Sequence, residues 1–544
     1  MKSFYSISIL LFSLINTTQA QAPSWLWSKG VVSAVGGSVK VDVNGNAYVT
    51  GAFTNTVSFG DDTLIGIGYG NIFVVKYDPS GNVIWARSAG GPGNGYDAAN
   101  SICVDAKGNA YIAGSFDGDT LIFGADTLIN TGLHNIFIAK YDSSGNLIWA
   151  KSAKGPGYDV GCSISTDAMG NAYMTGYFSG SSIVFGTDTI TPINTGQFNI
   201  IIVKIDSVGN VLWAKNAGTT GFNQGLGISI DASGDSYITG YFTDTIAFNA
   251  DTLKGHAGSD NIFIAKFDPS GNEIWAKNPN GIGQSNSIST DVSGNAYITG
   301  YFENPFMSFG EDTLTNATYY YHSFIAKYDS SGNAVWARSI SGTTNNVANA
   351  VCTDLNGSAY ITGYFNDTTI FFGPDTLINS NSQNIFVCKY DRSGNVIWAQ
   401  SVGGGTDDSW GIGTDLLGNA YITGGYTVPS IIFGTDTLYT TVGGHSFFLA
   451  KLDSSNQNPA GISTINSPDK ITIYPNPSNG TFYFSGVQSG SSIEVYNMLG
   501  EMVYSGQGNT DIYPVSLSGQ AKGIYFYKAS NNAGTIQQGK MVLE

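Results

Sequence analysis

The sequence predicts an all-β protein, a seven-bladed β-propeller closed by an N-terminal strand and followed by a small C-terminal β-sandwich. Three observations predict this fold. Two motifs recur seven times each at a near-constant spacing, and the first six repeats have the pattern of four short strands. The last repeat lacks its fourth strand, and a matching segment stands alone near the start of the chain. A repeat of this length indicates equivalent structural units packed side by side.

The first motif reads Asp-x-x-Gly-Asn-Ala-Tyr-Ile-Thr-Gly in its fullest form. Its tyrosines lie 60 to 64 residues apart, at Tyr48, Tyr111, Tyr173, Tyr237, Tyr297, Tyr360 and Tyr421. The second motif reads Lys-Tyr-Asp-x-Ser-Gly-Asn-x-Ile-Trp-Ala, and its lysines are Lys76, Lys140, Lys204, Lys266, Lys327, Lys389 and Lys451. A third segment, Phe-Gly-x-Asp-Thr-Leu, lies between them in each repeat.

Within one repeat, short runs rich in Tyr, Ile, Phe and Val alternate with turns of Asp, Asn and Gly. In the third repeat the expected strands are Ser163–Thr166, Ala172–Phe178, Asn199–Lys204 and Val211–Lys215. Strands joined by such turns form hairpins, and four antiparallel strands form a propeller blade. We expect the Phe-Gly-x-Asp-Thr-Leu segment to add a small hairpin between the second and third strands.

The two ends of the repeat region predict how the ring closes. The seventh repeat stops at Asp453 without a fourth strand. Trp25–Lys29 resembles the fourth strand of the other repeats and has no blade of its own. We therefore expect it to complete the last blade, because an open ring would leave a sheet edge unpaired.

The repeats resemble the SBBP type of β-propeller repeat, in both the Asp-x-x-Gly-Asn-x-Tyr-x-x-Gly segment and the Lys-x-Asp-x-x-Gly-Asn-x-x-Trp hairpin. The resemblance covers residues 24–454. It implies a propeller outside the cell and no single biochemical activity.

The remaining chain predicts export. Residues 1–20 have the positive start, the apolar run and the small-residue cleavage site of a signal peptide. The propeller is expected over residues 21–453 and a polar linker over 454–470. Residues 471–544 combine Tyr-Pro-Asn-Pro, Gly-Ile-Tyr-Phe-Tyr and Gly-Lys-Met-Val segments, with alternating strands that predict a sandwich of about seven strands.

The order of these segments resembles the type A C-terminal sorting domain of the type IX secretion system. The resemblance implies that residues 471–544 are recognised by that secretion machinery. It also implies a Gram-negative source, removal of the domain, and a mature protein that is released or held at the outer cell surface. An accessory binding domain is the alternative.

Composition excludes some partners. Lysines and arginines number 23 against 40 acidic residues, a formal net charge of −17, which disfavours nucleic acid and anionic lipid. No segment is long and apolar enough to be expected as a membrane span. The four cysteines are Cys103, Cys162, Cys352 and Cys388. Their places in the repeats are too far apart for bridges, so buried free thiols are expected.

One polar position breaks the repeat and is a candidate for ligand binding. It lies eight residues before each Asp-x-x-Gly turn and is held by Asp97, Asp159, Asn223, Asn346 and Asp407, with Gly283 and Ala34 in the other two blades. Strand order places it near the mouth of the central channel. A ring of carboxylates and amides there would suit a cation or a ligand, and hydrogen bonding between blades is the alternative.

Exposed aromatic residues are the second candidate. Tyr319, Tyr320 and Tyr321 precede the third strand of the fifth blade, and Trp410 is expected in the loop that enters the seventh blade. Connectivity places both loops on one face of the propeller. Aromatic side chains there would offer a platform for sugars or proteins, with local packing as the alternative.

The sequence shows no catalytic or metal-binding pattern. The Asp-x-x-Gly-Asn turns lack the ligand spacing of a calcium loop and are expected to be Asx turns, although calcium stays open. The Asp-Thr pairs are interpreted as turn caps. The four histidines have no zinc spacing, and no nucleophile elbow is present. We therefore expect a non-enzymatic binding or structural propeller without a cofactor. The alternatives are a carbohydrate-binding or adhesin-like protein and a polysaccharide-active enzyme that uses carboxylates at the channel mouth.

Overall fold

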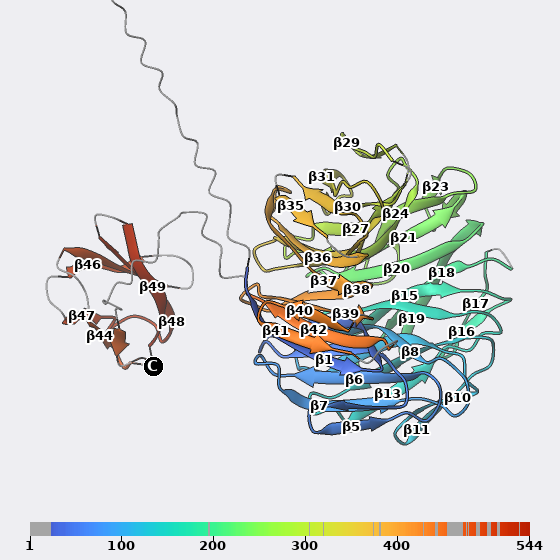
Figure 1. Ribbon diagram of the computed structural model, residues 1–544, viewed down its shortest axis with the longest axis horizontal. Coiled ribbons are helices and arrows are strands. Elements are labelled where there is room, and N and C mark those ends of the chain that lie inside the picture. The colour runs from blue at the N-terminus through green and yellow to red at the C-terminus, as the bar shows by residue number, and fades with distance from the viewer. Residues whose placement is uncertain are drawn as a thin grey trace, which may run out of the picture. The chain divides into compact units, whose positions relative to one another are not determined.

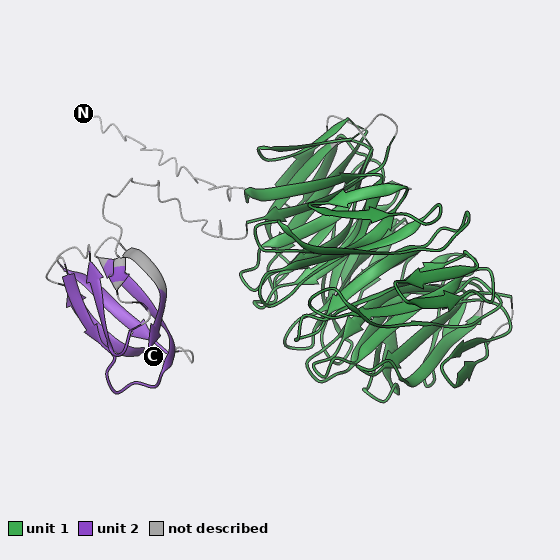
Figure 2. Cartoon of the chain, turned by 90° about the horizontal axis from the view of Figure 1, so that it is seen from below, with its two compact units in different colours: residues 1–459 green, residues 460–544 purple. Residues whose placement is uncertain are grey.

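The structure is a computed structural model. It describes residues 23–453 except 194–195, 304, 319, 374, 380–381, 428 and 441–443, and residues 472–543 except 475, 477, 486–489, 498–501, 509–511 and 532–533. The chain divides into two compact units, residues 1–459 and 460–544 (Figure 2). The expected signal peptide and linker lie outside the described residues.

The first unit is the predicted propeller, with seven antiparallel blades of four strands in its described residues (Figure 1); the third blade is extended by the hairpin of β22 (Thr245–Ala247) and β23 (Thr252–Lys254), which pairs with β19 (Val211–Thr220). The innermost strands are β2 (Ala34–Val41), β8 (Ala98–Val104), β14 (Val160–Thr166), β20 (Asn223–Ile230), β26 (Gly283–Thr290), β32 (Asn346–Thr353) and β38 (Asp407–Thr414). The second strands are β3 (Ala47–Phe53), β9 (Ala110–Phe116), β15 (Ala172–Phe178), β21 (Ser236–Thr243), β27 (Ala296–Phe302), β33 (Ala359–Phe365) and β39 (Ala420–Tyr426).

The outer half of each blade follows the same order. The third strands are β6 (Asn71–Tyr77), β12 (Asn135–Tyr141), β18 (Asn199–Ile205), β24 (Asp260–Phe267), β30 (His322–Tyr328), β36 (Gln383–Tyr390) and β42 (Ser446–Leu452). The fourth strands are β7 (Val83–Ala89), β13 (Leu147–Ser152), β19 (Val211–Thr220), β25 (Glu273–Lys277), β31 (Ala334–Ser339), β37 (Val396–Gly405) and β1 (Trp25–Val32). Blades are numbered one to seven from β2 to β38.

The ring closes as the sequence predicts. Each innermost strand contacts the next, and β38 contacts β2. Strand β1 pairs antiparallel with β42, with Trp27 opposite Lys451 and Lys29 opposite Leu449. The first strand of the chain is therefore the fourth strand of the seventh blade.

The repeated residues join neighbouring blades. In blade six, the buried Tyr360 hydroxyl donates to Asp354 Oδ2 at 3.2 Å and to the Gly418 carbonyl of blade seven at 2.9 Å. Lys389 Nζ lies 4.6 Å from the centre of the Tyr360 ring and 3.4 Å from Asp354. Trp336 Nε1 of blade five donates to the Arg392 carbonyl of blade six at 2.9 Å. The motifs recur because each blade must bind the next through the same groups.

Each Phe-Gly-x-Asp-Thr-Leu segment forms the expected hairpin. The hairpins are β4 (Thr56–Phe59) with β5 (Asp62–Ile65), β10 (Thr120–Phe123) with β11 (Asp126–Ile129), β16 (Ile183–Phe185) with β17 (Asp188–Ile190), β22 (Thr245–Ala247) with β23 (Thr252–Lys254), β28 (Phe306–Phe309) with β29 (Asp312–Thr315), β34 (Thr369–Phe372) with β35 (Asp375–Ile378), and β40 (Ser430–Phe433) with β41 (Asp436–Tyr439).

The interpretation of the Asp-Thr pairs as turn caps is wrong in at least three blades. Asp62 Oδ2 accepts the N–H of Ala86 at 2.7 Å, and Asp312 Oδ2 accepts that of Ala337 at 2.8 Å. Asp436 Oδ2 accepts the N–H of Ser28 on β1 at 2.9 Å. These carboxylates bind the outermost strand of their own blade, where a backbone donor would otherwise face solvent.

The four thiols are unpaired, as expected. Cys103, Cys352 and Cys388 are buried, but Cys162 is only half-buried, which corrects its expected burial. Burial raises the pKa of the Cys103, Cys162 and Cys352 thiols to about 12. The three buried thiols act as small apolar residues of the core.

The second unit has the expected seven strands in its described residues. One sheet contains β43 (Thr472–Tyr474), β44 (Thr481–Ser485) and β47 (Ile512–Ser516), and the other contains β46 (Met502–Gly508), β45 (Ser491–Tyr496), β48 (Gly523–Asn531) and β49 (Gly534–Leu543). Side chains of both sheets share one core, which includes Phe482, Phe484, Val495 and Tyr527. The unit has its own core and is a separate domain.

Candidate binding face

The two faces of the propeller differ in their loops. Tight Asx turns connect the first strand to the second in each blade, and the third to the fourth in blades one to six, and they define the turn face. In one such turn, Asp105 Oδ1 accepts the N–H groups of Lys107 and Asn109, and Gly108 has the positive φ of 78° that the turn requires. The longer connections between blades and between the second and third strands lie on the opposite face, which we call the loop face. Sequence variation is therefore concentrated on the loop face.

The five predicted polar residues lie on the loop side but are buried. Their side chains are at most 1% exposed, at Asp97, Asp159, Asn223, Asn346 and Asp407. Asn223 Nδ2 donates to the Phe198 carbonyl of blade three at 3.1 Å. Asn346 Oδ1 accepts the N–H of Ser323 in blade five at 2.8 Å. These two amides link neighbouring blades, and in this conformation the five residues offer almost no surface to a ligand. A binding role for them stays a prediction.

Two of the three aspartates, Asp97 and Asp159, lie in surroundings that disfavour their charged form. Asp97 Oδ2 accepts the N–H of Gly91 at 3.1 Å, and Asp159 Oδ1 accepts that of Ser179 at 3.3 Å. The second oxygen of each carboxylate has no hydrogen-bond partner among the described residues. Burial raises the pKa of each carboxyl group to about 7, because the charged form loses its hydration.

Trp410 does not lie in a loop, as expected from the sequence, but on strand β38 in the central channel. In each innermost strand the pairing register shifts by one residue, and this bulge turns one side chain toward the channel. The seven bulge residues are Gly37, Asn100, Cys162, Leu226, Asn286, Asn349 and Trp410, and all line a cavity of 170 Å³. Trp410 is the largest of them and remains 41% exposed.

The predicted tyrosine cluster is only partly described, because Tyr319 lies outside the described residues. The Tyr320 side chain is 51% exposed. The Tyr321 ring packs against that of Tyr301, with 4.4 Å between ring centres, and the Tyr321 N–H donates to Asn345 Oδ1 at 2.9 Å. Tyr321 therefore packs on Tyr301 while remaining 36% exposed, and Tyr320 is the more exposed of the two.

The structure adds a group of tyrosines that the sequence reasoning missed. Four consecutive blades carry a tyrosine near the end of the second strand, and we call this group the tyrosine arc: Tyr177, Tyr241, Tyr301 and Tyr364. Each is partly exposed. The other three blades have Ala52, Ser115 and Gly425 at this position. Aligning the repeats would have shown this difference, because the segment Ala-Tyr-Ile-Thr-Gly-Tyr-Phe varies at its sixth residue.

Members of the arc lie beside one another. Burial and the neighbouring Asp260 and Tyr177 raise the pKa of Tyr241 above its usual range. The pKa of Tyr301 is likewise raised by burial and by Tyr321, Asp260, Glu303 and Tyr241. Such electrostatic effects act between close groups. The arc thus occupies one strand position in four adjacent blades, three to six.

Carboxylates and amides line the arc. Gln284 Nε2 donates to Asp260 Oδ2 at 2.7 Å, and Gln383 Nε2 donates to Asp408 Oδ1 at 2.5 Å. Burial raises the pKa of Asp408 to about 6, and burial together with Asp260 raises that of Glu303. None of these three carboxylates forms an ion pair with a described residue. The arc is thus bordered by hydrogen-bonding groups, and these three carboxylates have no ion-pair partner among the described residues.

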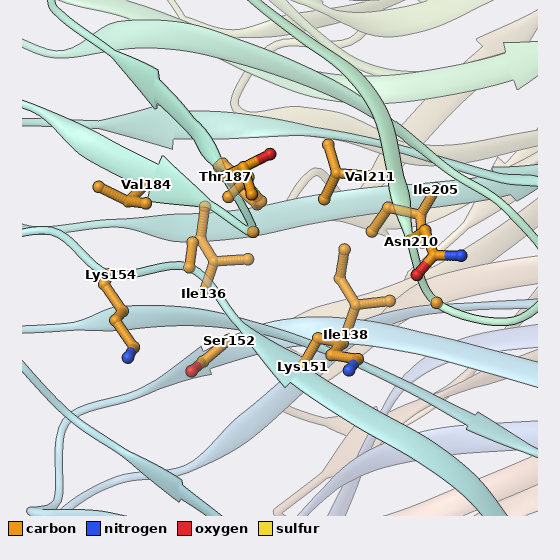
Figure 3. Close-up of a pocket in the computed structure, with 14 residues that line it drawn as sticks. Ile136, Ile138, Lys151, Ser152, Lys154, Val184, Thr187, Ile205, Asn210 and Val211 are labelled. Carbon is orange, nitrogen blue, oxygen red and sulfur yellow. The ribbon is translucent and has the colours of Figure 1, made fainter.

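A separate groove of 480 Å³ lies between blades two and three (Figure 3). Ile136, Ile138, Val184 and Val211 line it, and Lys151 is at its edge. Related grooves occur between blades five and six and between blades seven and one. Because the groove recurs where neighbouring blades meet, we interpret it as a packing feature of the ring.

The described residues contain no group of three His, Cys, Asp or Glu side chains that is arranged to hold a metal ion. They also contain no helix with the length and apolar character needed to cross a bilayer.

Comparison with known proteins identifies the second unit. Residues 472–544 match the family described as the secretion system C-terminal sorting domain. This domain directs type IX secretion, so the protein reaches the cell surface or the medium, as predicted. The match begins at the first described strand of the unit.

The propeller is similar to proteins of varied function. An uncharacterized WD repeat-containing protein of Acanthamoeba polyphaga mimivirus is 28% identical over 444 residues, covering 67% of this chain and 32% of its own length. This chain thus spans about a third of that relative. Solved structures with similar folds include the Pan2 WD40 domain of Neurospora crassa (9% identity, TM-score 0.38, 79% of this chain and 96% of that one). Two other structures are also similar. One is the apocarotenoid oxygenase of Synechocystis (12% identity, TM-score 0.38, 78% of this chain and 97% of that one). The other is PorZ of Porphyromonas gingivalis, a surface component of the type IX secretion system (10% identity, TM-score 0.21, 94% of this chain and 86% of that one).

Proposed function

We propose that this protein is an exported, non-enzymatic β-propeller that binds an extracellular macromolecule through its loop face. Its first membrane passage would use the signal peptide expected at residues 1–20, and its second uses the sorting domain. The resemblance of the repeats to the SBBP type agrees with an extracellular role. No cofactor is required for this function.

One observation carries the proposal. Exposed aromatic side chains gather on the variable loop face and at the channel mouth, including Tyr320 at 51%, Phe222 at 50% and Trp410 at 41%. Exposed aromatic groups beside hydrogen-bonding groups are typical of binding surfaces. The turn face repeats the same Asx turn in every blade and offers no comparable variation.

A binding screen on the full chain tests this function. The immobilised protein is exposed to polysaccharides and to extracellular proteins, with and without calcium, and saturation is measured. Trp410→Ala and Tyr320→Ala remove loop-side aromatic groups, whereas Met169→Ala changes an exposed residue of the turn face. We expect saturable binding that the first two variants weaken and the control retains. Absence of saturable binding, or equal loss in all three variants, would contradict the proposal.

A carbohydrate-active enzyme is the less favoured alternative. Its carboxylates at the channel mouth would be Asp97 and Asp159, which are at most 1% exposed. A general acid must reach the bond that it protonates. Hydrolysis of a polysaccharide that is lost in both Asp97→Asn and Asp159→Asn would favour the enzyme over the binding protein.

A further inference from the structure

The tyrosine arc differs from the other aromatic groups of the loop face because it breaks the sevenfold symmetry of the fold. A tyrosine needed for the blade itself would occur in all seven blades, as Tyr48 and its equivalents do. The arc position instead holds tyrosine in blades three to six and Ala, Ser or Gly in the others. The blade therefore folds without a tyrosine here, and four adjacent tyrosines call for another explanation.

Further aromatic side chains lie beside the arc. Tyr177 lies 4.8 Å from Phe198, which lies 5.6 Å from the half-exposed Phe222, as measured between ring centres. In blade five, the ring centres of Tyr301 and Tyr321 are 4.4 Å apart. The result is an extended strip of rings across four blades, which suits an elongated ligand better than a compact one.

The polar groups beside the strip restrict the chemistry of that ligand. Asp260 and Asp408 each accept a hydrogen bond from a glutamine amide, so each side-chain pair offers both donors and acceptors. Carboxylates without a paired cation repel polyanions, and the whole chain carries a net charge of −17. Hydroxyl groups can donate to carboxylates and can both donate to and accept from amides, and the C–H face of a sugar ring packs on a tyrosine ring.

We propose that the tyrosine arc binds an uncharged polysaccharide, with successive sugar rings packed on Tyr177, Tyr241, Tyr301 and Tyr364 and their hydroxyl groups bound to the Gln284–Asp260 and Gln383–Asp408 pairs. This inference rests on the proposed binding function and specifies its ligand class. A cationic peptide is the competing ligand, because it too would tolerate the acidic surroundings.

The test measures binding of defined oligomers to the full chain by calorimetry. The neutral probes are hexasaccharides of β-1,4-glucan, β-1,3-glucan, β-1,4-mannan and β-1,4-xylan. A polygalacturonate hexamer is the anionic probe, and a hexalysine peptide is the cationic one. We expect at least one neutral probe to bind and the anionic probe to bind more weakly than it. Failure of all four neutral probes, or binding of hexalysine alone, overturns the inference.

Variants locate the site. Tyr241→Ala and Tyr301→Ala introduce the residue that blade one carries at this position, so the fold has a precedent for them. Loss of one stacking contact should weaken neutral-probe binding about tenfold. Tyr301→Phe keeps the ring and should stay within about fivefold of the parent, because it removes at most one neutral hydrogen bond. Tyr69→Ala changes a tyrosine outside the arc that is 62% exposed and should have no effect.

The outcomes separate this inference from the proposed function. Neutral-probe binding that is unchanged in both alanine variants overturns the arc as the site. A protein ligand that binds the loop face while no neutral sugar binds overturns the inference and leaves the binding function standing. Thermal unfolding checks that the arc variants are folded. The unfolding temperatures of Tyr241→Ala and Tyr301→Ala are compared with those of Tyr301→Phe and Tyr69→Ala, which should equal that of the parent.

Discussion

Replacing Asp97 or Asp159 by asparagine should stabilise the protein at high pH and leave its stability at low pH almost unchanged. Both carboxylates are buried, each has one oxygen without a hydrogen-bond partner among the described residues, and burial raises the pKa of each from 3.8 to about 7. Blades four and six hold Asn223 and Asn346 at the same position. Asparagine therefore fits the site and carries no charge to desolvate.

Proton linkage determines whether stability rises or falls with pH. The folded state holds the proton more tightly than the unfolded chain, so between about pH 4 and pH 7 folding binds protons and stability falls as the pH rises. Below this window both states are protonated, and above it both are ionised. A shift of about three pKa units corresponds to at most ~4 kcal/mol per site, because each unit is worth ~1.4 kcal/mol. Structural relaxation and water entry reduce this value.

The assay is urea unfolding of Asp97→Asn, Asp159→Asn and the double variant from pH 3.5 to pH 8.5. We expect a gain of ~2–4 kcal/mol per site above pH 7, a gain close to zero at pH 3.5, and near-additivity in the double variant, since the two sites are in different blades. A gain that is independent of pH, or a loss above pH 7, would refute the reasoning.

Asp78 provides a control in which stability changes with pH in the opposite direction. Burial tends to raise the pKa of Asp78, but hydrogen bonds from Asn82, Ser80 and Gly81 outweigh it, and the pKa is lowered. Its ionised form therefore stabilises the fold above the unfolded pKa, and this contribution disappears as the pH falls. Asp78→Asn should cost stability at neutral pH and nothing at the acid end.

Three further predictions follow from the packing. Trp27→Ala should lower the free energy of unfolding by about 2–3 kcal/mol, somewhat less than for a fully buried tryptophan. The substitution also removes the hydrogen bond that Trp27, on the closing strand, donates to the Pro79 carbonyl of blade one at 3.1 Å. An unchanged unfolding midpoint would argue against closure by this strand. Tyr360→Phe should lose about 1–2 kcal/mol, since it removes the hydroxyl that joins Asp354 to Gly418, and a change within error would show that this link is dispensable. Cys103, Cys352 and Cys388 should resist a thiol reagent at pH 8 in the native protein and react once it unfolds, because none forms a disulfide and burial raises the pKa of each. Rapid labelling before unfolding would contradict the burial.

The fold could be predicted from the sequence because its determinants are local and repeated. Each signal can be recognised from a few adjacent residues, as in the Asx turns, the strand alternation and the isolated Trp25–Lys29 segment. The buried tyrosine, lysine and tryptophan of the motifs proved to be the groups that join the blades. Sevenfold recurrence made each signal easy to separate from chance.

The candidate site was harder to predict because it depends on side-chain direction and on comparison between blades. Trp410 was placed in a loop, since sequence does not reveal the bulge that turns it into the channel. The Asp-Thr pairs were interpreted as caps, because the strand their carboxylates reach lies about 24 residues away, as in the Asp62–Ala86 bond. The tyrosine arc was overlooked because each tyrosine alone fits an ordinary strand position. Only their adjacency in space makes them a surface.

Closure by β1 and β42 links the integrity of the chain to its export. The closing strand is at the beginning of the propeller, its partner is at the end, and the sorting domain comes after both. A chain truncated anywhere within the blades lacks both the partner of β1 and the segment that the secretion machinery recognises. The order of these segments thus links completion of the ring to the presence of the sorting domain. A chain that ends prematurely within the blades therefore lacks both ring closure and the sorting domain.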